Sequence, residues 1–237
     1  MKTRLLFLLA CCLAINGKAQ SFILSDDFSY ATVKDSDGCV NVRESPNSKA
    51  KINGRISNYT VFNCEETGTN WWKVEQIKED GWLDGYVYKD RIILLNWNEI
   101  KKKNRYGDSA IFKRDSLTVI IHANVFYPKK HKLSYYKNTK GELEKIDGKR
   151  IWGTDGNIPK KDISSVKIIK NDNVLLLPRT AFDDLYEPNL ADMSIYNGPE
   201  NTLYIRMDNS DGAGGYTVIW IFKDDKYMGR YIDNSLA

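Results

Sequence analysis

Short runs of apolar and β-branched residues, bounded by residues that favour turns, dominate the first third of the chain. They occupy residues 39–43, 51–56, 59–65, 71–76 and 82–88. Val40 and Val42 fall on one face of their run, and Trp72 and Val74 on one face of theirs, as expected for strands with one buried side. Strands of about five residues between Gly, Pro, Asn and Ser turns predict a compact β-barrel or sandwich.

The runs in the second half of the chain are longer. They cover residues 116–122, 164–170, 173–177, 201–208, 216–222 and 227–232. In 216–222 apolar side chains occupy both parities, which predicts a central strand that is covered on both faces. Residues 162–165 and 181–186 could instead form a short helix or a helical turn. The pattern predicts a mainly β protein, with a small barrel followed by a larger antiparallel sheet or sandwich and little helix.

Several sequence blocks in the first unit carry a resemblance to a known family. The blocks are VNVRESP at residues 40–46, Ile52, Ile56, NWWKV at residues 70–74 and GYVY at residues 85–88. In order and spacing, residues 34–94 resemble the bacterial Src homology 3 domain family. Asn41 and Arg43 match a structural strand of that family. The resemblance implies a small β-barrel that commonly belongs to exported, cell-wall-facing proteins, binds peptides or wall polymers, and carries out no chemistry.

The resemblance also implies a binding groove. Trp71 and Tyr88 fall where exposed aromatic side chains would contact a ligand. The chain departs from the family pattern at Ser45, where a glycine is usual before the turn proline, and at residues 89–91, which lack a further groove aromatic. For Trp71, packing in the core or at an edge is an equally open interpretation.

The remainder of the chain resembles uncharacterised exported bacterial proteins that also carry the first unit. The likeness rests on a Gly-Thr-Asp-Gly turn at 153–156, a Leu-Tyr-Glu-Pro-Asn stretch at 185–189 and a glycine-rich loop at 208–215. It implies no known activity. The organisation that we expect is a signal peptide (1–19), an N-terminal lead (20–33), a barrel (34–95), a linker (96–108) and a β-rich domain (109–237).

The first residues have the three parts of a secretory signal. Two basic residues precede an apolar run at 5–15, and small residues stand at Gly17 and Ala19. This order predicts export to the periplasm or beyond, with cleavage after Ala19. The run is shorter than the roughly 20 residues that span a bilayer, so we expect no transmembrane segment. The alternative is a lipoprotein signal, in which Cys11 would carry the lipid.

Charge argues against nucleic acid as a partner. The chain carries 35 basic and 31 acidic side chains. Removal of residues 1–19 takes away three basic residues and no acid, which leaves 32 basic against 31 acidic groups. Proteins that bind nucleic acid usually show a clear basic excess on one face. We interpret the basic clusters at 101–105 and 129–132 as solvated turns, with a polyanion site as the alternative.

Cys39 and Cys64 would be the only cysteines after cleavage. An oxidising compartment permits a disulfide between them. This bond would stabilise a unit of about 60 residues, which is near the lower size limit for an independent core. Two buried free thiols are the alternative.

The most site-like sequence is the loop DNSDGAGG at residues 208–215, between two strong strands. Its glycines free the backbone for unusual dihedral angles or for the close approach of a ligand. Asp208 and Asp211 could bind a cation there, or the backbone amides could bind an anion. The loop does not fit the EF-hand register, and the plain alternative is a wide acidic hairpin loop.

The sequence offers no constellation typical of an enzyme or a metal site. Nucleophilic and metal-assisted catalysis generally need His or Cys near carboxylates. His122 and His131 are the two histidines, and neither has further ligands at a usual spacing. Adjacent carboxylates such as Asp183 and Asp184 could act as acid and base, but such adjacency is expected by chance among 31 acidic residues. We expect no catalytic residue, no metal and no cofactor.

Three functions remain open, in order of preference. The first is a non-enzymatic exported protein that recognises a peptidoglycan-derived or other cell-wall component, a peptide or a partner protein in the envelope. The second is an inhibitor or immunity-type protein that caps a toxin or hydrolase with loops such as 208–215. The third is a hydrolase of wall or glycan material that uses carboxylates of the second unit.

Overall fold

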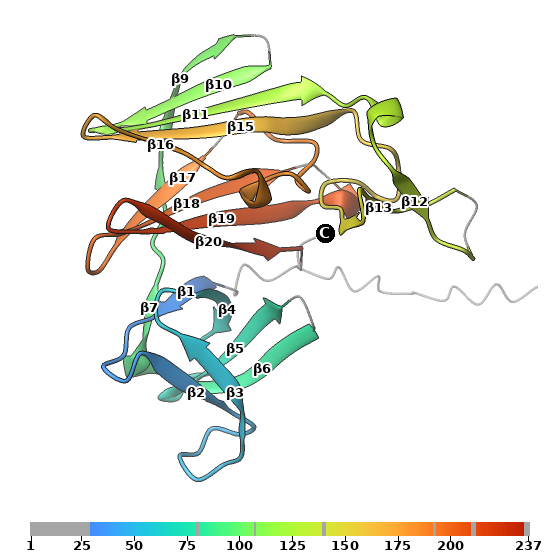
Figure 1. The fold of residues 1–237 in the computed structure, drawn as a ribbon. Helices are drawn as coiled ribbons and strands as arrows, with labels where there is room; N and C mark the ends of the chain where they lie inside the picture. The colour runs from blue at the N-terminus through green and yellow to red at the C-terminus, as the bar shows by residue number, and fades with distance from the viewer. Residues whose placement is uncertain are drawn as a thin grey trace, which may run out of the picture.

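The computed structural model describes residues 29–78, 81–106, 108–138, 141–191, 193–209 and 212–234. Its regular structure is almost entirely antiparallel β (Figure 1), so the prediction of a mainly β protein is confirmed. The helical segments in these ranges are single 3-10 turns: η1 Lys89–Arg91, η2 Pro128–Lys130, η3 Arg179–Ala181 and η4 Gly212–Gly214. None of the described segments is a helix with the length and hydrophobicity of a membrane span.

Seven strands form the sheet of the first unit, in the order β3-β2-β6-β5-β4-β1-β7. The strands are β1 Ser29–Val33, β2 Cys39–Arg43, β3 Ile52–Ser57, β4 Val61–Glu65, β5 Trp71–Lys78, β6 Gly81–Tyr88 and β7 Ile92–Leu94. Val40, Val42 and Val74 are buried in one core, as their alternation predicted. Strand β1 lies in the segment expected to be a lead, because Ala31 and Val33 complete this core.

This sheet is open, which differs from the expected closed barrel. Among the described strands, β3 and β7 at its two ends share no ladder. Ile56 of β3 and Leu94 of β7 nevertheless pack on the same core. Side-chain packing, rather than a continuous set of backbone hydrogen bonds, therefore closes the unit around its interior.

Two five-stranded sheets form a sandwich in the second unit, as predicted. One has the order β16-β15-β11-β10-β9 and the other β20-β19-β18-β17-β8. Their strands are β8 Asn98–Glu99, β9 Lys101–Tyr106, β10 Ser109–Arg114, β11 Leu117–Val125, β15 Lys161–Lys170, β16 Asn173–Leu176, β17 Ser194–Gly198, β18 Thr202–Asn209, β19 Tyr216–Lys223 and β20 Lys226–Asp233. Side chains from both sheets, such as Phe112, Ile121 and Trp220, share the largest hydrophobic core.

The sheet that contains β19 is the middle of three layers, between the other sandwich sheet and the first unit (Figure 1). On one face of β19, Val218 and Trp220 enter the sandwich core. On the other face, Ile219 and Ile221 pack in a cluster that includes Tyr30 of the first unit. The prediction that residues 216–222 form a central strand covered on both faces is confirmed.

Within the segment expected to be a linker, Asn98–Glu99 and Lys101–Tyr106 form strands β8 and β9. Strand β8 pairs with β17, and β9 pairs with β10, so this segment passes from one sandwich sheet to the other. A lysine-rich run is typical of a turn, but it also suits an edge strand, where charge discourages pairing with other chains. Residues 162–165, for which a short helix was the alternative, lie in β15. Residues 181–186 begin at Ala181, the last residue of the 3-10 turn η3.

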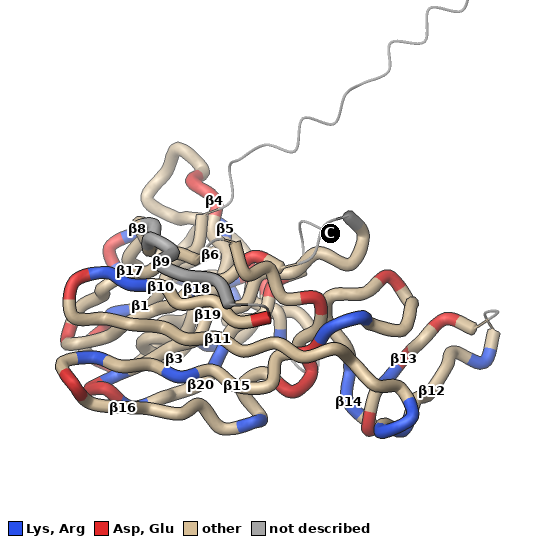
Figure 2. Tube along the Cα trace, turned by 90° about the horizontal axis from the view of Figure 1, so that it is seen from above, with Lys and Arg blue, Asp and Glu red and all other residues tan. Residues whose placement is uncertain are grey.

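A small three-stranded sheet projects from one end of the sandwich (Figures 1 and 2). It consists of β12 Leu133–Tyr135, β13 Leu143–Ile146 and β14 Lys149–Arg150. Leu143 and Ile146 pack with Phe126 and Tyr186 in a separate small core, which fixes the projection to the sandwich. Basic and acidic residues are interspersed along the described part of the chain in Figure 2.

The predicted disulfide is not formed: Cys39 and Cys64 are free thiols. Strands β2 and β4, which carry them, are separated in the sheet by β6 and β5. Cys64 is buried in the core. Cys39 alternates with Val40, which faces that core, so its side chain lies on the opposite face. The two sulfurs therefore lie on different sides of the sheet, where a disulfide has no suitable geometry.

The free thiols lead to a testable difference in reactivity. Burial raises the pKa of the Cys64 thiol to about 12, so at pH 8 only about one molecule in 10,000 carries the reactive thiolate. For the chain that begins at Gln20, we expect a thiol reagent to modify half-buried Cys39 and to leave Cys64 unmodified until the protein unfolds. Mass spectrometry of the labelled protein measures this. If neither cysteine were labelled in denaturant without reductant, Cys39 and Cys64 would be joined in a disulfide after all.

Candidate functional site

The two aromatic residues predicted for a groove in the first unit meet across strands β5 and β6. Trp71 lies directly opposite Tyr88 in the antiparallel ladder. Their rings pack edge to face, with centroids 5.5 Å apart and an interplanar angle of 82°, a geometry that aromatic pairs favour. Both side chains are half-buried, so each keeps part of its surface in contact with solvent.

These rings form one wall of a hollow of about 540 Å³. The turn with Pro46, Asn47 and Ser48 forms another part of the lining, and Arg91 completes it. Pockets of roughly 300–1,000 Å³ with a few polar groups among apolar ones are typical of small-ligand sites. The predicted groove residues thus line a hollow of suitable size.

The turn that lines this hollow is held by its own hydrogen bonds. Arg43, which the resemblance assigned to the structural strand, donates from Nη1 to the carbonyl oxygen of Ala50 at 2.7 Å. The amide of Lys49 donates to Asn47 Oδ1 at 2.9 Å, and the amide of Ala50 donates to the Asn47 carbonyl at 3.1 Å. Because these bonds exist without a ligand, the wall requires little ordering when one binds.

The loop at 208–215 is described only in part, because Asp211 lies outside the described residues. Asp208 belongs to strand β18, where its Oδ1 accepts hydrogen bonds from Thr217 Oγ1 at 2.5 Å and from Arg206 Nε at 3.0 Å. The guanidinium of Arg206 also lies 5.1 Å from the ring centre of Tyr30 in the first unit. Asp208 therefore has structural partners, and a cation site that includes Asp211 stays a prediction.

Two glycine-rich segments noted separately in the sequence meet in space. A Cβ atom on Gly214 would lie 2.8 Å from the carbonyl carbon of Thr154, so only glycine allows this approach. Gly153 has φ of +107°, and a Cβ there would lie 2.3 Å from the carbonyl oxygen of Tyr186. The segments share a hollow of about 740 Å³, which Ile158 and other residues also line. The sequence could not predict this meeting, because it depends on long-range packing.

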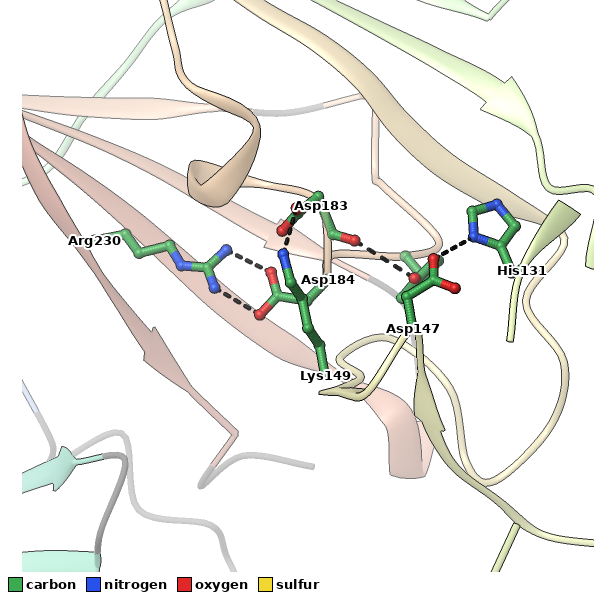
Figure 3. A network of polar contacts seen from close by, with 7 residues as sticks. His131, Asp147, Lys149, Asp183, Asp184 and Arg230 are labelled. Atoms are coloured by element: carbon green, nitrogen blue, oxygen red, sulfur yellow. Dashed lines mark hydrogen bonds and ion pairs between the residues drawn. The ribbon is translucent and has the colours of Figure 1, made fainter. Parts of the chain in front are cut away.

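A network of ion pairs lies beside this region, at the end of the sandwich near β14 (Figure 3). The carboxylate of Asp184 accepts a hydrogen bond from each terminal nitrogen of Arg230, both at 2.6 Å. Asp183 is paired with Lys149. The adjacent carboxylates that could have formed an acid–base pair are therefore each bound to a different cation. Their adjacency was the one sequence signal for this network, since the partners come from distant segments.

The two histidines also have partners. His122 Nδ1 and Ser109 Oγ lie 2.6 Å apart. His131 Nδ1 lies 2.7 Å from Asp147 Oδ2 (Figure 3), and this contact is the main cause of the lowered pKa of that carboxyl group. The His131 ring stacks on Phe126 with centroids 4.6 Å apart. Both side chains therefore take part in local packing and hydrogen bonding.

The structure has several hollows of a size that suits small ligands. Within the described ranges, no three His, Cys, Asp or Glu side chains form a group that could hold a metal ion. Trp71 and Tyr88 are the sequence-predicted residues that line a hollow together. Arg150 and Trp152, which line another cavity, were missed because nothing in their local sequence distinguishes them.

Comparison of the chain with protein-family models, curated proteins and solved structures found no match.

Proposed function

We propose that this is an exported, non-enzymatic binding protein that recognises a cell-wall component or peptide in the envelope through the first unit. The observation that carries the proposal is the hollow between the Trp71–Tyr88 pair and the turn with Pro46. Two partly exposed aromatic rings provide a large contact surface at a low cost in conformational entropy. The hydrogen-bonded turn supports the proposal because it preforms its part of the lining.

Export is the second part of the proposal. It is supported by the basic start, the apolar run at 5–15 and the small residues up to Ala19. Fractionation of cells that express the full chain, followed by N-terminal sequencing of the product, tests it. A product that starts at Gln20 outside the cytoplasm agrees with export, and an uncleaved cytoplasmic product contradicts it.

A second candidate function is a cap on a toxin or hydrolase by the loops of the second unit. The observation that favours it is the tight packing of Gly214 against Thr154, which fixes two neighbouring loops at one end of the sandwich. Fixed loops are suited to inserting into a partner's cleft because little entropy is lost. A one-to-one complex with the product of a neighbouring gene would favour this function over the first.

Replacement of Trp71 by alanine is expected to weaken binding to purified peptidoglycan at least tenfold, since tryptophans in binding hollows often dominate affinity. The melting temperature should fall by only a few degrees, because Trp71 is half-buried and is the first residue of strand β5. A pull-down titration and a thermal melt of the same samples measure the two effects. Large loss of stability with retained binding would show that Trp71 is a packing residue.

Trp82→Ala is the matched control for this variant. Trp82 lies on the same β5–β6 hairpin, opposite Ile77. It is 60 % exposed and does not line the hollow. We expect it to bind peptidoglycan as the unchanged protein does. Failure of the unchanged protein to bind peptidoglycan at any salt concentration would count against a wall ligand.

A further inference from the structure

A second cavity, of about 490 Å³, lies between the first unit and the end of the sandwich. Ile77 of β5 contributes to it from the first unit, and Tyr231 contributes from the edge strand β20. Arg150 of β14 and the neighbouring Trp152 form another part of the lining, next to the ion pairs of Figure 3. This cavity is separate from the hollow at Trp71.

Arg150 is the distinctive residue of this cavity. Its guanidinium carbon lies 4.0 Å from the ring centre of Trp152, so the planar group is held against the indole. The guanidinium of Arg150 makes no hydrogen bond or ion pair with the side chains or backbone of other described residues, whereas Lys149 and Arg230 in the same lining are paired with Asp183 and Asp184. An arginine stacked on a ring keeps its edge N–H groups for a planar anion such as a carboxylate.

The segment that presents Arg150 is anchored by backbone hydrogen bonds. The amide of Trp152 donates to the carbonyl oxygen of Asp184 at 3.1 Å, and the amide of Tyr186 donates to the carbonyl oxygen of Trp152 at 2.9 Å. The same contacts hold Asp183 and Asp184 beside the cavity. Arg150 and the ion pairs therefore keep their relative positions without a ligand.

The ion pairs give the cavity both kinds of hydrogen-bonding group. Asp183 and Asp184 present carboxylate acceptors, and Lys149 and Arg230 present donors. A hydroxyl group can accept from one and donate to the other. Such a lining suits a ligand with several hydroxyl groups.

We propose that this cavity binds a sugar that carries a carboxylate. Arg150 would hold the carboxylate, the Asp183 and Asp184 ion pairs would bind the hydroxyl groups, and Trp152 would keep Arg150 in place. A neutral sugar leaves the arginine without its anion, and a simple carboxylate leaves the hydroxyl-binding groups unused. The cavity volume is in the range, roughly 300–1,000 Å³, that holds small ligands.

Calorimetric titration with D-glucuronate, D-glucose and acetate tests the proposal. D-glucuronate should bind with a dissociation constant of about 1 mM or lower, and the other two probes at least roughly tenfold more weakly, because each lacks one half of the recognised chemistry. Arg150→Gln should weaken D-glucuronate binding at least tenfold and leave the melting temperature unchanged, since Arg150 is exposed.

Lys226→Gln removes the same charge at an exposed position of β20 that does not line the cavity, and it should bind D-glucuronate like the unchanged protein. Trp71→Ala should also keep this binding, which separates the cavity from the proposed wall-binding hollow. Equal binding of acetate and D-glucuronate, unchanged binding in Arg150→Gln, or no saturable D-glucuronate binding would each overturn the proposal.

Discussion

Replacement of Trp220 by alanine is expected to lower the free energy of unfolding by about 3–5 kcal/mol. Trp220 is fully buried between the two sandwich sheets and is the largest such side chain among the described residues. Its Nε1 donates a hydrogen bond of 2.9 Å to the carbonyl oxygen of Ala181. The change leaves a cavity and also removes this donor from a buried carbonyl. Denaturant unfolding followed by circular dichroism measures the loss.

The same substitution at Trp82 controls for the chemistry of the change. Trp82 is 60 % exposed, so its removal should alter the free energy of unfolding by less than about 1 kcal/mol. A Trp220→Ala variant as stable as the Trp82→Ala variant would show that the two sandwich sheets do not depend on this core. The hydrogen bond to Ala181 also fixes the segment that leads to Asp184, so Trp220 connects the core to the ion-pair network.

Strands with strong alternation or a continuous apolar run could be predicted from the sequence, and weakly patterned strands could not. Strand β2 has the predicted bounds Cys39–Arg43, and β19 was correctly placed as central. Strand β17, Ser194–Gly198, was missed because Ile195 is its only buried residue and its other positions are typical of turns. Its place depends on pairing with β8 and β18, which is a long-range contact.

The same distinction applies to the candidate sites. Trp71 and Tyr88 were predicted from the family resemblance, and their contact requires only the register of one hairpin. Arg150, Asp184 and Arg230 come from three distant segments, so no local pattern brings them together. The disulfide prediction was wrong for a related reason, since spacing along the chain does not reveal which face of a strand each cysteine occupies.

The middle sheet of the three layers also connects the two units through polar side chains. Asp233 of β20 is 3 % exposed, and its Oδ2 accepts hydrogen bonds from Tyr30 Oη and from Asn63 Nδ2, each at 2.9 Å. Both donors belong to the first unit. Nearby, Thr32 Oγ1 and Tyr204 Oη lie 3.1 Å apart across the same interface. Polar groups buried in this way must be paired, so they fix how the units dock.

Replacement of Asp233 by alanine is therefore expected to lower the free energy of unfolding by about 2–4 kcal/mol, because two buried donors lose their shared acceptor. The first unit should lose more protection than the sandwich, since its docking depends on these bonds and its own core is small. Hydrogen exchange measured by mass spectrometry compares peptides from β2 to β6 with peptides from β10, β11 and β15.

Asp90→Ala provides the control, because Asp90 is an exposed residue of η1 with the same charge and no contact with the second unit among the described interactions. It should change the free energy of unfolding by less than about 0.5 kcal/mol. If Asp233→Ala raised exchange equally in both units, the bonds would support overall folding and not docking. If it changed neither stability nor exchange, the hydrophobic cluster of Tyr30, Ile219 and Ile221 would be sufficient to hold the units together.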